Sequence, residues 1–167
     1  MLIYPENEWN IYDEDGVMLP YYTHPSLEWI KKNIPKEVSV LEIGGGNSTI
    51  WWRKNASEVY TIETDLDCAK KLDCFQCSHI EIPNAIDKLN KKFDVVIVDG
   101  DGDRECYIIN SFNSCAKYLI VDNWQQSEVM IYSEKIEEFL FENTVEQLIF
   151  KQSNHKDWKT AVFIKKA

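Results

Sequence analysis

Short apolar runs alternate along the chain with amphipathic segments, which is the hydrophobic pattern of an α/β protein. Five runs read as buried strands, and each is followed by a segment with helical periodicity. The expected strands span residues 38–43, 58–63, 79–82, 93–98 and 118–121, and the expected helices span 49–55, 65–73, 85–91, 104–114 and 133–142. Strands joined through helices in this way pair as a parallel sheet.

A further helix is expected before the first of these strands, over residues 25–34. Leu27, Ile30 and Ile34 fall on one face of that helix, and Pro25 suits its first turn because no backbone N–H is needed there. This helix should therefore pack an apolar face against the sheet.

The end of the chain breaks the alternation. Apolar runs at 145–150 and 160–164 are separated by a polar loop instead of a helix, which predicts an antiparallel hairpin. The run FDVVIV at 93–98 has only one polar residue, as expected for a strand covered on both faces. We therefore expect a Rossmann-like, doubly wound α/β fold, with five parallel strands closed by a C-terminal antiparallel hairpin, seven strands in all.

Composition adds the domain organisation. The chain has 167 residues, 44% of them hydrophobic and 28% charged, which is typical of one globular domain. We expect a single domain over 1–167, with an N-terminal segment and helix at 1–35 and a core at 36–167. No apolar run approaches the roughly 20 residues of a membrane span. The N-terminal residues lack the signal-peptide pattern, so we expect a cytoplasmic protein without membrane partners.

Charge and cysteine content narrow the function further. The formal net charge of −10 repels phosphate backbones and disfavours a nucleic-acid substrate. The chain has 5 cysteines, and the spacing of Cys74 and Cys77 is that of a zinc knuckle or a redox pair. No second such pair and no paired histidine motif completes a zinc site. Reduced, unpaired thiols are therefore expected.

A glycine turn follows the first strand of the core, in the stretch V-L-E-I-G-G-G-N-S. Gly44 and Gly46 fit the dinucleotide fingerprint G-x-G-x-x-G, but Thr49 stands at the third glycine position. Glu42 would repel a pyrophosphate and attract an ammonium or sulfonium group. Glu63, at the end of the second strand, supplies an acid for ribose hydroxyls. The turn therefore favours a positively charged nucleoside cofactor over a dinucleotide.

Four motifs at the strand ends carry a resemblance to a known family. They read V-L-E-I-G-G-G-N-S, I-E-T-D, F-D-V-V-I-V-D-G-D and Y-L-I-V-D-N. With the final hairpin they resemble the class I S-adenosylmethionine-dependent methyltransferase family, from about residue 38 to residue 164. The resemblance implies S-adenosyl-L-methionine as cofactor and methyl transfer to a small-molecule acceptor.

The strand-end chemistry favours an O-methyltransferase. The Asn/Asp-Pro-Pro-aromatic motif of the adenine and glutamine N-methylases does not follow the fourth strand. Two other functions on the same fold stay open, namely a regulatory module that binds S-adenosylmethionine without transferring its methyl group and an enzyme that cleaves it. Acceptor identity and oligomeric state are left open by the sequence.

The resemblance also implies residue roles. Glu42 would lie beneath the methionine moiety, Glu63 would bind the ribose hydroxyls, and Asp99 would face the transferred methyl group as the catalytic residue. The implied cofactor-binding set is Glu42, Gly44, Gly45, Gly46, Ser48, Glu63, Asn84, Ala85 and Asp99.

Ser48 departs from the family pattern, and Asn84 has an alternative role. Ser48 stands where the family often has another glycine. Asn84 and Ala85 are expected just after the third strand, where the family contacts adenine, and a simple helix cap is the alternative for Asn84.

A metal site is a further hypothesis. Asp99 ends the fourth strand and Asp122-Asn123 end the fifth, and neighbouring strands lie about 4.8 Å apart. Three oxygen ligands suit Mg²⁺, which would acidify a substrate hydroxyl. The arrangement is similar to the cation-dependent catechol and caffeoyl-coenzyme A O-methyltransferases, although Gly102 stands where a basic residue or histidine often follows. The alternative is that Asp122 and Asn123 only cap the next turn and that Asp99 bonds locally, as a structural cap for the turn at residues 100–103.

Aromatic residues and histidines complete the candidates. Trp124 follows the fifth strand and is expected at the substrate mouth, whereas at least one of Trp51 and Trp52 is expected in the core. In the family that the motifs resemble, the residues before the first helix often form a lid over the cofactor, so the resemblance implies an N-terminal lid within 1–35 and a cofactor-binding core at 36–167. His24 and His155 are each either a base or a surface residue.

Overall fold

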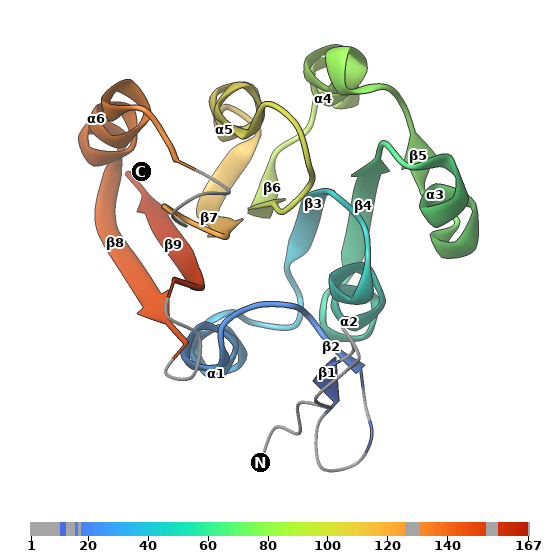
Figure 1. The fold of residues 1–167 in the computed structure, drawn as a ribbon, viewed down its shortest axis with the longest axis horizontal. Helices are drawn as coiled ribbons and strands as arrows, with labels where there is room; N and C mark the ends of the chain where they lie inside the picture. Colours follow the sequence, from blue (N-terminus) through green and yellow to red (C-terminus); the bar gives the residue numbers. More distant parts are fainter. Residues whose placement is uncertain (1–10, 13–15, 17, 126–130, 153–156, 167) are drawn as a thin grey trace.

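Seven strands form one mixed sheet at the centre of the molecule, with helices on both of its faces (Figure 1). The computed structural model describes residues 11–12, 16, 18–125, 131–152 and 157–166. The strands of the sheet are β3 (Ser39–Ile43), β4 (Glu58–Glu63), β5 (Phe75–Gln76), β6 (Phe93–Val98), β7 (Cys115–Asp122), β8 (Thr144–Lys151) and β9 (Lys159–Lys165). Their order across the sheet is β5-β4-β3-β6-β7-β9-β8.

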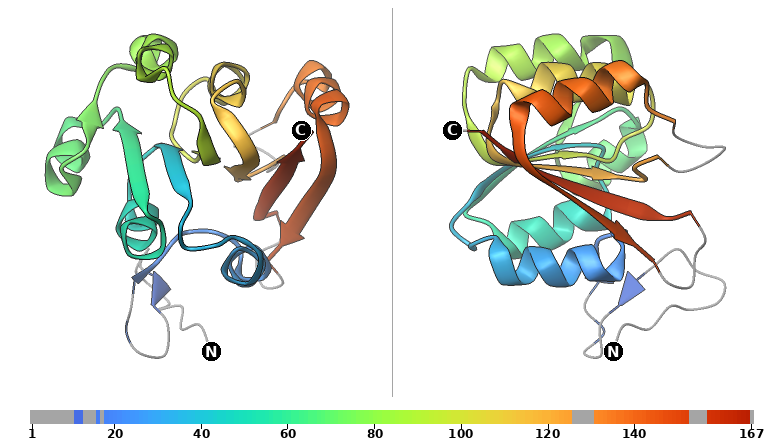
Figure 2. Two further views of the ribbon diagram at one scale, coloured as in Figure 1. Left: turned by 180° about the vertical axis from the view of Figure 1, so that it is seen from behind. Right: turned by 90° about the vertical axis from the view of Figure 1, so that its left-hand side faces the viewer.

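Helices cover the sheet in two layers. They are α1 (His24–Asn33), α2 (Asn47–Asn55), α3 (Leu66–Leu72), α4 (Ile82–Leu89), α5 (Arg104–Phe112) and α6 (Glu134–Asn143). Figure 2 shows α4, α5 and α6 above one face of the sheet and α1 and α2 below the other. The short strands β1 (Ile11–Tyr12) and β2 (Met18–Leu19) pair separately as an antiparallel ribbon.

The strand directions confirm the predicted fold class. β5, β4, β3, β6 and β7 pair in parallel, and β9 pairs antiparallel with both β7 and β8. The chain leaves β3 toward β4 on one side and returns to β6 on the other. This change of direction creates a crevice at the carboxyl ends of β3 and β6, where doubly wound sheets bind ligands.

The predicted third strand is wrong in position. Residues 79–82 form the 3₁₀ turn η1 (His79–Glu81) and the first residue of α4, while the strand β5 lies earlier. The Glu81 carboxylate accepts hydrogen bonds from the backbone N–H and the hydroxyl of Ser78, at 2.9 and 2.6 Å. Pro83 lies in the first turn of α4. A cap followed by an early proline favours a helical start over the strand that the apolar pattern predicted.

Apolar packing on the two faces follows the sequence pattern. Leu27, Ile30 and Ile34 of the first helix segment are buried as predicted, and β6 is buried from Val95 to Val98. Trp52 is also in the core, where its Nε1 donates to the Tyr22 hydroxyl at 3.2 Å. The residues before α1 therefore include core packing as well as any lid.

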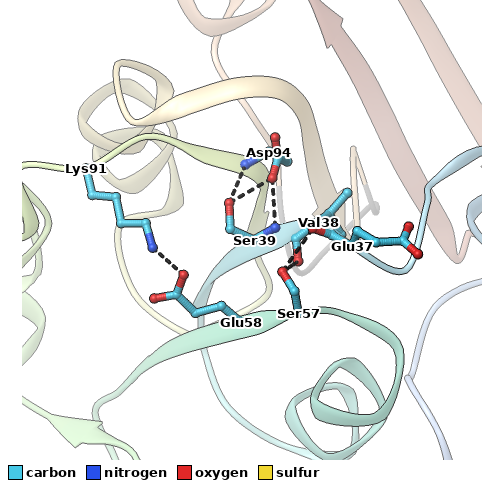
Figure 3. A network of polar contacts seen from close by, with 7 residues as sticks. All are labelled: Glu37, Val38, Ser39, Ser57, Glu58, Lys91 and Asp94. Atoms are coloured by element: carbon cyan, nitrogen blue, oxygen red, sulfur yellow. Dashed lines mark hydrogen bonds and ion pairs between the residues drawn. The ribbon is translucent and has the colours of Figure 1, made fainter.

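Polar contacts join the amino ends of the central strands (Figure 3), which are the ends opposite to the crevice. Oδ2 of Asp94 accepts from the backbone N–H and the hydroxyl of Ser39, both at 2.8 Å. Lys91 forms an ion pair with Glu58 at the start of β4. The single polar residue of FDVVIV therefore has a structural partner on the neighbouring strand.

All five cysteines are unpaired thiols, as predicted. Burial raises the pKa of the Cys74 thiol to about 11, which keeps it protonated and unreactive near neutral pH. In the described part of the chain, no helix has the length and apolar character to cross a membrane.

Candidate cofactor and catalytic site

The glycine turn after β3 packs directly against the turn after β6. Gly44 has a φ of 94°, and a Cβ atom on it would lie 2.2 Å from the backbone nitrogen of Gly100. The Ile43 carbonyl accepts from the N–H groups of Asp99 and Gly100 at 2.9 and 2.8 Å. Gly44 is therefore required by a backbone–backbone contact between the two strand ends.

Glu42 is a buried acid beneath this turn. Its side chain is 0% exposed, and its Oε2 accepts from the hydroxyls of Thr49 at 2.6 Å and Thr61 at 2.9 Å. Its Oε1 has no hydrogen-bond partner among the described residues. Burial raises the pKa of the Glu42 carboxyl, and the surrounding hydroxyls oppose that rise. Such an orphaned buried acceptor suits a ligand that brings a positive donor.

Asn47 adds a second orphaned polar group at the start of α2. Its Nδ2 is buried and has no hydrogen-bond partner among the described residues. Gly46, immediately before it, borders open space, since an added Cβ there would meet nothing within 4 Å. Sequence reasoning missed Asn47, although its place directly after three glycines was a signal.

Glu63 fastens the end of β4 to the glycine turn. Its Oε2 accepts from the Gly45 N–H at 2.5 Å, and its Oε1 accepts from the N–H groups of Thr64 and Asp65 at 2.6 and 2.8 Å. The structure therefore brings Glu42, the glycine turn and Glu63 together at the crevice.

Asp99 follows β6 at the same crevice. Its side chain is 21% exposed, and its Oδ1 lies 3.8 Å from a guanidinium nitrogen of Arg104. Burial raises the pKa of the Asp99 carboxyl well above its ordinary value, and the neighbouring charge of Asp122 raises it further. Arg104 opposes these effects. Asp99 can therefore hold a proton under conditions where an exposed aspartate cannot.

Asp122, at the end of β7, is directed toward β9. Its Oδ1 accepts from the Thr160 hydroxyl at 2.5 Å, and its Oδ2 accepts from Nε1 of Trp158 at 3.5 Å. The Thr160 oxygen in turn accepts from the backbone N–H of Thr23, just before α1, at 2.9 Å. Asp122 therefore connects the crevice to the start of the first helix.

The predicted metal ligands do not form an open oxygen cluster. Both carboxylate oxygens of Asp122 already have donors, and Asn123 has a φ of 55°, in a tight turn. Within the described residues, no three histidine, cysteine, aspartate or glutamate side chains are grouped to hold a metal ion. These contacts tie the Asp122 carboxylate to β9 and the loop before it, which leaves it poorly suited to Mg²⁺ ligation.

Asp122 predicts a pH-dependent stability. Burial raises the pKa of its carboxyl from 3.8 to about 7, so the folded state holds a proton that the unfolded chain releases. This contribution is present below pH 4 and is lost as the pH rises toward 7. We expect wild type to have a lower unfolding midpoint at pH 8 than at pH 5, and Asp122→Asn to reduce that difference. Thermal melts of both proteins at the two pH values measure it, and equal differences would contradict the assignment.

The expected position of Asn84 and Ala85, directly after the third strand, is wrong. Asn84 and Ala85 lie inside α4 and do not follow the third strand, and Asn84 is exposed. The strand β5 ends at Gln76, so the residues directly after it are Cys77 and Ser78. The error comes from the misplaced strand, because the role was carried over by position.

Trp124 differs from its expected place, whereas the roles of Ser48 and His24 stay predictions. Trp124 is buried, with its ring stacked on Tyr132 at a centroid distance of 4.5 Å, and so belongs to the core instead of a substrate mouth. Ser48 is buried in the first turn of α2. His24 begins α1, where burial lowers its pKa and favours the neutral ring. His155 lies outside the described residues.

A cavity of about 320 Å³ lies elsewhere, between α1 and α2. Its walls include Ile34, Trp51 and Asn55, from the later turns of both helices and the segment after α1. This cavity is therefore separate from the glycine turn. The candidate site is defined instead by the polar groups at the ends of the strands.

Comparisons with known proteins agree with this architecture. No protein-family model matches the chain, and no curated protein matches it in sequence. Several solved structures do share its fold.

The O-methyltransferase TomG from Streptomyces achromogenes, in complex with S-adenosylmethionine, matches at TM-score 0.64 and 16% identity, covering 90% of this chain and 83% of that one. An O-methyltransferase from Bacillus cereus with bound S-adenosylhomocysteine matches at 0.59 and 15%, covering 88% and 84%. The N-methyltransferase NodS from Bradyrhizobium japonicum matches at 0.57 and 17%, covering 85% and 93%. The chain has the fold of these methyltransferases.

Proposed function

We propose that this protein is an S-adenosylmethionine-dependent methyltransferase that methylates a hydroxyl group of a small-molecule acceptor. The observation that carries the proposal is the buried Glu42, whose Oε1 accepts no hydrogen bond from the described residues and lies beneath a glycine turn in a fold shared with methyltransferases. Fold alone does not define activity, so the argument rests on the chemistry of the site.

The residues at the glycine turn fit this cofactor. The methionine moiety carries an ammonium donor and a carboxylate acceptor. The turn offers a buried acceptor, Glu42 Oε1, and a buried donor, Asn47 Nδ2, neither of which has a partner among the residues that the structure describes. Glu63 is an acid at the end of β4 that can turn from the backbone N–H groups to ribose hydroxyls. A pyrophosphate would instead face two acids.

Asp99 is proposed as the residue that receives the acceptor proton. The bound cofactor supplies a methyl group that its positive sulfur activates. As the acceptor oxygen takes up that methyl group from the sulfur, the Asp99 carboxylate would accept the hydroxyl proton. The protein's main task is to hold the two reactants in line.

The N-terminal segment, residues 1–35, is proposed to close over the cofactor as part of one domain. The supporting contact is the hydrogen bond from Thr23 to Thr160, which ties the start of α1 to the strand end beside Asp122. A shift of the start of α1 would therefore displace Thr160 and, through it, the Asp122 carboxylate at the acceptor side of the crevice.

Calorimetry tests the cofactor assignment. We expect micromolar-range binding of S-adenosylmethionine or S-adenosylhomocysteine, and no comparable binding of NAD. Glu63→Ala should weaken that binding by about 1.5–3 kcal/mol, because charged hydrogen bonds are lost. Glu58→Ala, at the opposite and exposed end of the same strand, is the matched control and should leave the affinity unchanged. Tight NAD binding, or a silent Glu63→Ala, would contradict the assignment.

Turnover assays separate methyl transfer from the two other functions. Labelled S-adenosylmethionine is incubated with the protein and a panel of hydroxyl and amine acceptors. Labelled acceptor supports the proposal, binding without product supports a regulatory module, and cofactor breakdown without acceptor supports a cleaving enzyme.

A further inference from the structure

Arg104, the first residue of α5, binds main-chain oxygens at the ends of both β6 and β7. Its Nε donates to the Gly100 carbonyl at 2.7 Å, and its Nη2 donates to the Asp99 carbonyl at 2.8 Å. Its Nη1 donates to the Asp122 carbonyl at 2.6 Å. All three guanidinium nitrogens therefore have backbone partners, and one rigid planar group joins the two strand ends.

The charge of Arg104 is buried at this position. Its side chain is 4% exposed, and the Asp99 Oδ1 lies 3.8 Å from Nη2. An arginine does not lose its proton in proteins, so this is a permanent positive charge. A buried charge is tolerated when it is hydrogen-bonded and paired, and here three carbonyl dipoles and one carboxylate meet that requirement.

The same strand ends were predicted to hold Mg²⁺ through Asp99, Asp122 and Asn123. The oxygen ligands at these strand ends do not suit Mg²⁺, because the Asp122 carboxylate already accepts hydrogen bonds from Thr160 and Trp158. A divalent cation placed beside Asp99 would also lie close to the guanidinium and be repelled by it.

We propose that Arg104 is the built-in cation of this site, and that it takes the place of a divalent metal and positions Asp99 toward the acceptor. The inference rests on the proposed methyl transfer and specifies it in two ways. Transfer proceeds without a metal ion. The acceptor presents a single hydroxyl to the Asp99 carboxylate, instead of two neighbouring hydroxyls that chelate a cation.

The metal half of the proposal is tested on the wild-type protein with Mn²⁺, whose free ion is measured by electron paramagnetic resonance. We expect no saturable Mn²⁺ binding and no loss of turnover after treatment with EDTA. Saturable binding that disappears in Asp122→Asn, or turnover that EDTA abolishes and Mg²⁺ restores, would overturn the proposal.

The positioning half is tested by comparing Arg104→Gln with Arg104→Lys. Both lose the three-point contact, but lysine keeps the charge and the reach to at least one carbonyl. We expect Arg104→Gln to lower turnover at least about tenfold, the scale of a misplaced reacting group, with cofactor affinity nearly unchanged. Arg104→Lys should recover part of the loss.

Arg53→Lys is the matched control, since Arg53 also binds two carbonyls, those of Leu72 and Asp73, but on the exposed surface. Its turnover should equal that of wild type. Equal turnover of folded Arg104→Gln and wild type would overturn the positioning role. If Arg104→Gln does not fold, the turnover of Arg104→Lys tests the positioning role instead. A variant that loses cofactor affinity but keeps the wild-type turnover number would contradict the proposal. A wild-type protein that binds no cofactor refutes the proposed function, whereas the Mn²⁺ titration still decides whether a metal site exists.

Discussion

Gly44→Ala is expected to destabilise the fold by roughly 2–5 kcal/mol, combining about 1–2 kcal/mol for a left-handed alanine with about 1–3 kcal/mol for overpacking. The added methyl group would lie 2.2 Å from the Gly100 nitrogen and 2.3 Å from its Cα. Both neighbours are backbone atoms, so no side-chain rotation relieves the overlap. Because the contact joins β3 to the turn after β6, the damage reaches the whole crevice. Urea unfolding and cofactor calorimetry should both report a loss.

Gly46→Ala separates the stability of the turn from its binding role. A Cβ at Gly46 meets nothing within 4 Å, so its cost to folding should stay below about 1 kcal/mol. If the cofactor crosses the turn where Gly46 borders open space, the same methyl group should still weaken cofactor binding. Comparable unfolding free energies for Gly44→Ala and wild type would show that the two strand ends are less tightly packed than described.

The sequence predicted well those parts of the fold that the apolar and polar residues of the element itself identify. β6 is apolar on both faces, and its only polar residue, Asp94, bonds to Ser39 at the strand's amino end. The final hairpin was also predictable, because a polar loop without helical periodicity lies between two apolar runs. In both cases the residues of the element itself decide its structure.

β5 could not be predicted in the same way. It consists of Phe75 and Gln76, both exposed, so no burial pattern marks it. The apolar run that follows was assigned instead, but the Ser78–Glu81 cap and Pro83 start a helix there. The wrong placement of Asn84 follows from that one error.

Side-chain direction at the strand ends depends on distant parts of the chain. Trp124 follows the fifth strand as expected, but its ring packs against Tyr132 and Phe163, which come from segments further along the chain. The Asp122 carboxylate is taken by Thr160 and Trp158 from β9 and its preceding loop. A residue's place at a strand end is readable from sequence, whereas its partner is not.

The contacts of Arg104 could not be predicted from the sequence for a related reason. Its position at the start of α5, directly after an acidic glycine-containing loop, is visible in the sequence. Its partners are carbonyl oxygens, which every residue has, so no residue type signals them. Only the pairing of β6 with β7 brings those oxygens within reach of one guanidinium.

Asp99→Asn is expected to reduce turnover at least tenfold, equivalent to about 1.4 kcal/mol in the barrier, while leaving folding and cofactor affinity nearly intact. The amide keeps the size of the side chain but cannot take the acceptor proton. Because burial raises the pKa of Asp99, wild-type turnover should rise as the pH increases above the ordinary aspartate range. The variant should lose that limb of the profile.

Asp94→Asn is the matched control for this experiment, with the same chemical change in β6 at its opposite end. Asp94 accepts from Ser39 and takes no part in the crevice, so its replacement should affect stability slightly and turnover not at all. Stopped assays with labelled cofactor across a range of pH measure both variants against wild type. Turnover by Asp99→Asn at the wild-type rate would mean that the acceptor proton leaves by another route. If Mg²⁺ restored the turnover of that variant, a metal site at these strand ends would be supported. The proposal that Arg104 takes the place of the metal would then be contradicted.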